Sequence, residues 1–138
     1  MTAAAIRALV ECRYFYTSRL SPGQPVTVVA DVLRAARAFN RHNGISGALL
    51  FDGEHFAQLL EGHASAVQAL ARRIEADPRH TGVDVRIEEV GRLEQVFEQW
   101  VCGWCEADEL RAIVAGATVP PLEQLATFEA LVRRSEVV

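Results

Sequence analysis

The stretch ISGALLFDGEHFAQLL, residues 45–60, contains two short apolar runs separated by Asp52-Gly53. An Asp-Gly pair between two such runs is the strongest short-range sequence signal for a β-hairpin. We therefore predict two strands, over residues 45–51 and 54–60, joined by a tight turn. The rest of the fold is predicted outward from this hairpin.

The segments around the hairpin show the periods of strands and helices. Residues 6–16 alternate, which predicts a strand whose apolar face carries one set of side chains. That set is Ile6, Ala8, Val10, Cys12, Tyr14 and Tyr16. Residues 26–41 and 63–76 have apolar residues at helical spacing, and the second helix must end before Asp77-Pro78, because a proline disfavours helical geometry at the residue before it.

Two more strands follow the second helix. Residues 83–90 alternate, and residues 100–105, WVCGWC, are short and aromatic. Both patterns indicate strands, and the LEQVFEQ stretch between them predicts a turn or a brief helix. The resulting order β-α-β-β-α-β-β predicts a ferredoxin-like α+β sandwich, with both crossover helices on one face of the sheet.

The C-terminal tail predicts two short helices, over residues 107–116 and 121–134. The second has an apolar stripe too weak to stabilise an isolated helix, so we expect it to pack on the sheet or on another subunit. The stripe consists of Leu122, Leu125, Phe128 and Val132. We accordingly assign residues 1–105 to the main domain and residues 106–138 to a C-terminal helical extension.

Composition restricts the classes of partner and location. The chain has 138 residues and a formal net charge of −4, which disfavours nucleic acid and anionic membranes as partners. We expect no signal peptide, because charged residues interrupt the N-terminal apolar residues, and no membrane span, because no apolar run is long enough. We also expect a cytoplasmic protein with its three cysteines reduced. Cys102 and Cys105 form a C-x-x-C, but residues i and i+3 of a strand face opposite sides, so we predict no redox pair and no metal site.

Gln58 is a polar amide on the apolar face that Phe56 and Leu60 share. A buried amide without partners costs about 1–3 kcal/mol, so its N–H and C=O groups need hydrogen bonds. Three other polar residues end the apolar faces of their predicted elements and are expected to point to the same side of the sheet as Gln58. They are Tyr16 in the first strand, Asn40 in the first helix and Asp77 after the second helix. Together they form either a polar network within the core or the binding edge for a planar heteroaromatic ligand.

The chain resembles the BLUF family of blue-light sensors using flavin, over about residues 6–105. Five motifs in the family's order carry this resemblance. They are Tyr16-Thr17-Ser18, Asn40 with the following RHNGISGALLF, FAQLLEG (56–62), DPRH (77–80), and FEQW (97–100) followed by Val101, Cys102 and Gly103.

The resemblance implies a domain that holds FAD or FMN non-covalently between its two main helices. It implies that Tyr16 gives an electron to the photoexcited flavin while a proton moves through Gln58, and that no substrate is turned over, so the chain is not an enzyme. By position, six residues would bind the flavin. They are Asn40, Gln58, Arg73, Asp77, Arg79 and His80.

One departure from the family concerns transmission of the signal. Trp100 and Cys102 are the expected transmission residues, and Cys102 stands where the family usually has methionine, which places a small thiol beside Gln58. The output then requires a downstream partner protein or a homo-oligomer. The alternative is a non-photoactive BLUF-like interaction module; a small hydrolase using Arg79 and His80 is a third reading, for which no local motif supplies a nucleophile.

Overall fold

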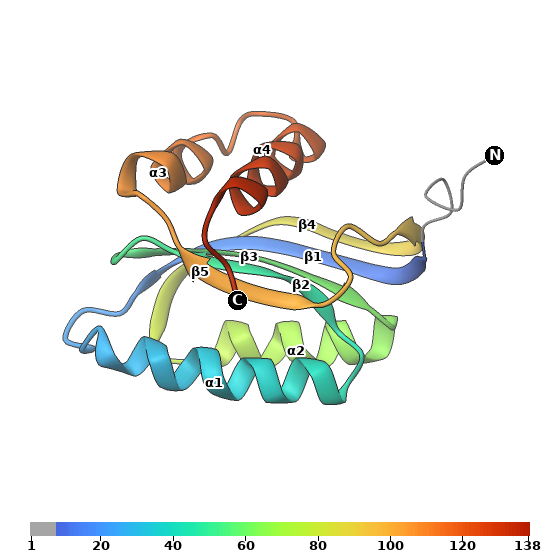
Figure 1. The fold of residues 1–138 in the computed structure, drawn as a ribbon, viewed down its shortest axis with the longest axis horizontal. Coiled ribbons are helices and arrows are strands. Elements are labelled where there is room, and N and C mark those ends of the chain that lie inside the picture. The colour runs from blue at the N-terminus through green and yellow to red at the C-terminus, as the bar shows by residue number, and fades with distance from the viewer. Residues whose placement is uncertain (1–7) are drawn as a thin grey trace.

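The computed structural model describes residues 8–138 and shows a five-stranded sheet between two pairs of helices (Figure 1). The elements are β1 (Leu9–Leu20), α1 (Thr27–His42), β2 (Ser46–Phe51), β3 (His55–Gly62), α2 (Ala64–Ala76), β4 (His80–Glu94), β5 (Trp100–Trp104), α3 (Ala107–Ala115) and α4 (Pro121–Arg134). The strand order is β4-β1-β3-β2-β5, in which only the β2–β5 pair is parallel. The predicted ferredoxin-like α+β fold is confirmed.

The hairpin forms at the predicted place with a longer turn. Phe51 pairs with Phe56, and the backbone N–H groups of Glu54 and His55 both donate to Oδ1 of Asp52. Gly53 has a φ of 100°, which residues with a side chain rarely adopt. Glu54, predicted as the first residue of the second strand, therefore belongs to the turn.

Two strands are longer than predicted. β1 continues to Leu20, four residues past the predicted end, while residues 6 and 7 of the predicted strand lie outside the described part of the chain. β4 spans His80–Glu94 because it pairs with β1 along almost its whole length, with bulges that shift the register. Most β4 side chains are exposed or half-buried, so apolar alternation does not mark its ends. Residues 95–99 form a turn, and the predicted possibility of a brief helix there is wrong.

Each face of the sheet has its own helical layer. Cys12, Tyr14 and Tyr16 belong to the core packed against α1 and α2, whereas Phe15 belongs to the core packed against the tail helices. The predicted cover of the open face by the tail is thus present (Figure 1). Leu122, however, is 65% exposed, whereas Leu131, which was not predicted as part of the stripe, is buried.

Arg86 of β4 fixes the tail helices to the sheet. Its side chain is almost fully buried and donates to the backbone carbonyl oxygens of Ile113 and Val114 at the end of α3, and to Oε1 of Gln124 in α4. The last carbonyl groups of a helix have no partner within the helix, so a cation there satisfies both their charge and their hydrogen bonds.

The last residues of the chain cover the outer edge of β5. Val138 exchanges two backbone hydrogen bonds with Cys102, of 3.1 and 2.9 Å, and Val137 forms a bridge with Gly103. A Cβ atom at Gly103 would lie 2.5 Å from the carbonyl oxygen of Glu136, so glycine is required for this close approach. The C-terminal segment 136–138 is therefore joined to the strand that carries Trp100 and Cys102.

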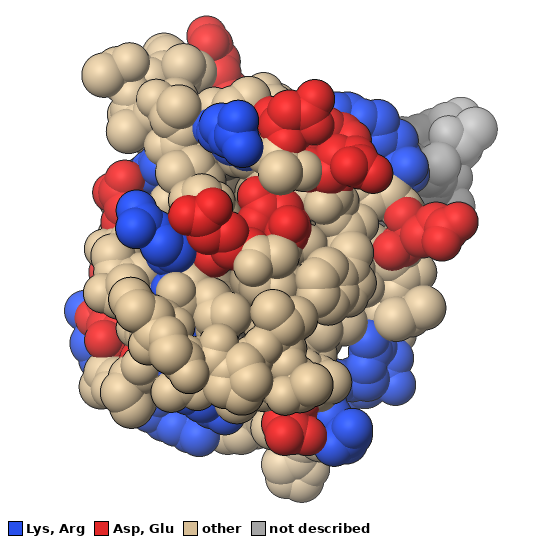
Figure 2. Space-filling model, turned by 90° about the vertical axis from the view of Figure 1, so that its left-hand side faces the viewer, with Lys and Arg blue, Asp and Glu red and all other residues tan. Residues whose placement is uncertain are grey.

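Charged side chains of both signs are mixed on one face of the molecule, and the two cysteines of the C-x-x-C belong to different cores. Figure 2 shows one face, on which acidic and basic side chains lie next to one another around an uncharged area, so this face has no continuous basic field. Within residues 8–138, no helix is long and apolar enough to cross a membrane. Cys102 belongs to the core beneath α1 and α2, and Cys105 to the core beneath the tail helices, as predicted for opposite faces of a strand.

Candidate functional site

A pocket of about 440 Å³ lies between α1, α2 and the sheet. The seven residues predicted for the photochemical and cofactor-binding roles all line it: Tyr16, Asn40, Gln58, Arg73, Asp77, Arg79 and His80. The rest of its wall is mostly apolar, with Val32, Phe39 and Leu49 among the lining residues. Such a pocket, apolar with a few convergent polar groups, has the composition of a small-molecule site.

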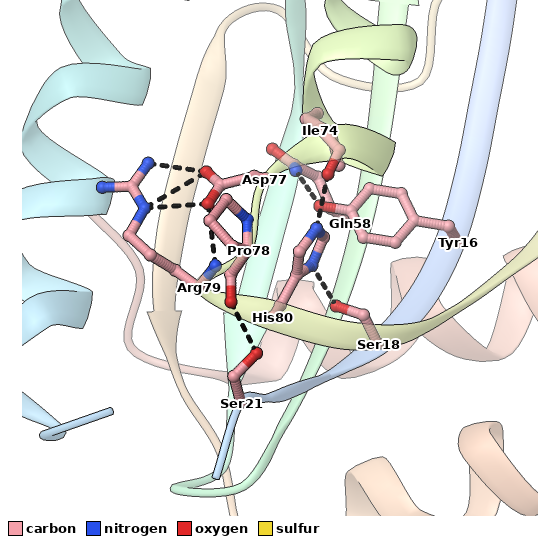
Figure 3. Close-up of polar contacts among 9 residues, drawn as sticks. All are labelled: Tyr16, Ser18, Ser21, Gln58, Ile74, Asp77, Pro78, Arg79 and His80. Carbon is pink, nitrogen blue, oxygen red and sulfur yellow. Dashed lines mark hydrogen bonds and ion pairs between the residues drawn. The ribbon is translucent and has the colours of Figure 1, made fainter. Parts of the chain in front are cut away.

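Gln58 is bonded at both ends of its amide. Tyr16 and Gln58 are cross-strand partners, and Nε2 of Gln58 donates to the Tyr16 hydroxyl oxygen at 2.6 Å (Figure 3). At the other end, Nε1 of the Trp100 indole donates to Oε1 of Gln58 at 3.0 Å. All three side chains are buried, and burial raises the pKa of Tyr16, which keeps its phenol neutral.

The bond between Trp100 and Gln58 was not predicted from the sequence. Sequence position suggested instead that Cys102 lies beside Gln58. In the sheet, Leu49 pairs with Gln58 on one side and with Cys102 on the other, so it separates the two. Trp100 reaches Gln58 because its long indole extends across β2, where its own partner is Gly47, which has no side chain.

Asn40 has an unsatisfied acceptor beside the pocket. It is 1% exposed, and among the described residues its side-chain oxygen Oδ1 has no hydrogen-bond partner. A buried polar atom without a partner is costly, and native structures rarely leave one unexplained. A ligand N–H group in the pocket would satisfy it.

The link between α2 and β4, with the first residue of β4, supplies the charged part of the pocket (Figure 3). Arg79 donates through Nε and one terminal nitrogen to the Asp77 carboxylate, and this pairing lowers the pKa of Asp77. His80 bridges Ser18 and the backbone oxygen of Ile74. Because a carbonyl oxygen only accepts, Nε2 of His80 carries a hydrogen, and in the neutral ring Nδ1 accepts from Ser18.

Arg73 is held over an aromatic ring at the same pocket. Its guanidinium carbon lies 4.8 Å from the centre of the Phe39 ring, so α1 and α2 meet through a cation–π contact.

Glu61 is a buried carboxylate that sequence reasoning did not single out. Its side chain, at the end of β3, is fully buried and accepts from the backbone N–H groups of Val96 and Phe97, at 2.9 and 2.8 Å, and from the Ser46 hydroxyl at 3.0 Å. Burial raises the pKa of Glu61, while the two N–H groups oppose that shift. Glu61 thereby fixes the turn that leads into Trp100. The sequence signal for this role was a charged residue on the strand face that also carries the apolar side chain of Leu59.

Fold and pocket together define a ferredoxin-like domain with a ligand-sized pocket between its helices and its sheet. Residues 12–103 match the family model BLUF, described as sensors of blue-light using FAD. The chain belongs to the BLUF family, whose domains bind flavin and act as blue-light sensors.

Three similar proteins illustrate the relationship. The chain is 37% identical over 68 residues to the blue light- and temperature-regulated antirepressor BluF of Escherichia coli. The aligned region covers 49% of this chain and 17% of the relative. It is 34% identical over 98 residues to the photoactivated adenylate cyclase subunit beta of Euglena gracilis, and this aligned region covers 70% of this chain and 11% of the relative. The chain thus spans less than a fifth of either relative.

A solved structure covers nearly the whole chain. The dark-state structure of BlrB, a BLUF protein, superposes with a TM-score of 0.69 at 31% identity, covering 91% of this chain and 97% of that one. The 9% of this chain that is not covered is shorter than the tail, residues 106–138, so the similarity includes part of that tail.

Proposed function

We propose that this chain is a cytoplasmic blue-light photoreceptor that holds an oxidised flavin, FAD or FMN, non-covalently in the pocket and is not an enzyme. The observation that carries this proposal is the Gln58 amide at the pocket wall, bonded to Tyr16 at one end and to Trp100 at the other. A bond network of this kind can exist in two arrangements, which is what a sensor requires.

The residues around the pocket divide into two groups by role. Asn40 and Gln58 offer hydrogen bonds to the ring edge, and four charged or titratable residues hold the rest of the cofactor: Arg73, Asp77, Arg79 and His80. A bound flavin would supply the blue-light absorption and the electron-accepting capacity. The unsatisfied oxygen of Asn40 is the feature of the pocket that fits such a ring most directly.

The proposed photochemistry uses Tyr16 as electron donor and Gln58 as the group that moves a proton and then changes its bonds. In the present arrangement, Gln58 presents its NH₂ group to Tyr16 and its oxygen to Trp100. If the amide rotated end for end, its NH₂ group would face the indole N–H, and two donors cannot bond. The hydrogen bond between Trp100 and Gln58 would be lost, so the change at Gln58 would reach β5, the strand that carries Trp100.

Arg37 of α1 offers a route from Trp100 to the C-terminal segment 136–138. Its guanidinium carbon lies 5.6 Å from the centre of the Trp100 ring, and the same group donates to the Cys102 sulfur at 3.0 Å and the Val138 oxygen at 2.8 Å. We propose that light loosens this junction, and that residues 106–138 then present an altered surface to a partner protein or a second copy of the chain.

Faster hydrogen exchange of residues 136–138 under blue light, measured by mass spectrometry, is the expected result; equal exchange in light and dark would contradict this route.

The first test of the proposal is the purified protein itself. We expect a yellow protein whose flavin band shifts reversibly to the red by a small amount under blue light. A colourless protein that cannot be reconstituted with FAD or FMN would instead favour the alternative, a BLUF-like interaction module without photochemistry. A yellow protein without the shift would contradict the light-sensing role.

Asn40→Ala should weaken flavin retention without abolishing photochemistry. The change removes one hydrogen bond to the ring edge, which is worth about 1 kcal/mol, or roughly a fivefold increase in the flavin Kd. Equilibrium dialysis of the variant against free flavin measures this loss, with the red shift recorded at matched flavin content. Unchanged retention would show that the Asn40 oxygen does not contact the ring.

A further inference from the structure

The chain has two tyrosines, and they lie next to each other on one face of β1. The ring centres of Tyr14 and Tyr16 are 5.5 Å apart, with an angle of 44° between the ring planes. Tyr14 is fully buried and, unlike Tyr16, does not line the pocket. An aromatic pair at this distance is in contact.

The two phenols have different hydrogen-bond partners. The hydroxyl of Tyr14 donates to Oε2 of Glu75 at 2.7 Å, and the other oxygen of Glu75 lies 3.5 Å from Nε of Arg72. Burial, and then the bond to Glu75, raise the pKa of Tyr14, so its phenol keeps its proton in the resting protein. The hydroxyl of Tyr16 receives an N–H from the Gln58 amide, which is a far weaker base than a carboxylate.

This difference decides where a positive charge on the pair is best accommodated. A phenol that loses an electron becomes strongly acidic, and Tyr14 already points its hydrogen at a carboxylate. We infer that Tyr14 and Glu75 form a second one-electron oxidation site, which takes the oxidising equivalent from Tyr16. The inference rests on the proposed function, because light-driven oxidation of Tyr16 is the source of that equivalent.

The step balances without an additional reactant. Tyr16, having lost an electron and still carrying its proton, takes one electron from Tyr14 and becomes a neutral phenol again. The O–H bond of Tyr14 breaks, and its proton passes to the Glu75 carboxylate. The products are a neutral Tyr14 phenoxyl radical, a neutral Glu75 carboxyl group and neutral Tyr16, so the total charge is unchanged.

The step removes the oxidising equivalent from the pocket. It leads to Glu75 of α2, whose side chain is 31% exposed. Because Gln58 takes no part, this path would compete with the rearrangement that signals. A hydrogen bond to a charged group is about twice as strong as a neutral one, so we expect the radical to favour Tyr14 over Tyr16 by about tenfold.

The test uses flavin-free protein, so it is independent of whether the proposed photochemistry occurs. The protein carries ring-deuterated tyrosine and is oxidised by one electron with a soluble ruthenium photo-oxidant, then frozen for electron paramagnetic resonance. Deuteration alters only tyrosyl signals, and the variants Tyr16→Phe and Tyr14→Phe give the reference spectra of each radical alone. The wild-type spectrum should match that of Tyr16→Phe, in which Tyr14 is the only tyrosine.

Glu75→Gln tests the role of the carboxylate. It keeps the size of the side chain but removes the base, so the radical should move to Tyr16 and the spectrum should match that of Tyr14→Phe. Glu88→Gln is the matched control, because Glu88 also pairs with Arg72 but is not a hydrogen-bond partner of Tyr14. A wild-type radical on Tyr16, the absence of any tyrosyl signal, or a radical that stays on Tyr14 in Glu75→Gln would overturn the inference. Failure of the proposed function alone would appear as a missing red shift in flavin-loaded protein.

Discussion

Tyr16→Phe should give a folded, yellow protein that no longer shows the red shift of the flavin band under blue light. The change keeps the ring in its place in the core and deletes only the hydroxyl group that bonds Gln58. Without the phenol, the proposed electron donor and the partner that orients the amide are both lost. We expect the dark-minus-light absorption difference to disappear, because the proposed electron donor is absent.

Gln58→Leu should abolish the shift in the same way, because an apolar side chain cannot move a proton or exchange bonds between Tyr16 and Trp100. Tyr14→Phe is the matched control: it makes the same chemical change on the same strand, two residues away, and should keep the red shift. The spectra are compared at matched flavin content. A full, reversible shift in Tyr16→Phe would disprove the donor role, and one in Gln58→Leu would make Gln58 only a satisfied amide of the core.

Glu61→Ala should destabilise the fold more than any other single change discussed. It leaves the N–H groups of Val96 and Phe97 and the hydroxyl of Ser46 without their acceptor in a buried place. Each unsatisfied buried group costs about 1–3 kcal/mol, so we expect a loss of roughly 3–5 kcal/mol in the free energy of unfolding. A domain of this size has only about 5–15 kcal/mol in total, so the variant should be marginally stable.

Urea unfolding followed by circular dichroism measures that loss. Glu54→Ala, which removes an exposed glutamate in the hairpin turn, is the matched control and should change stability by no more than about 0.5 kcal/mol. If the two variants unfolded at the same urea concentration, the Glu61 carboxylate would not be what holds the turn before Trp100.

The sequence by itself determined the order of the elements, because hairpin, strand and helix signals depend on neighbours in the chain. Asp52-Gly53 marks the hairpin and Asp77-Pro78 the end of α2, within a residue or two of the structure. Sequence also placed Tyr16, Asn40, Gln58 and Asp77 at one pocket, since the face of each follows from the period of its own element.

Only the tertiary structure decided which groups bond across the sheet. Trp100 and Gln58 are 42 residues apart, and Arg37 and Val138 are 101 apart. No local period encodes such pairs: they depend on strand order and register, and on how far a side chain extends. The same reason applies to Glu61. In the sequence it is a charged residue at the end of a strand, and it becomes a buried acceptor only through the N–H groups of the turn at residues 95–99. It applies also to β4, whose length is set by its backbone hydrogen bonds with β1.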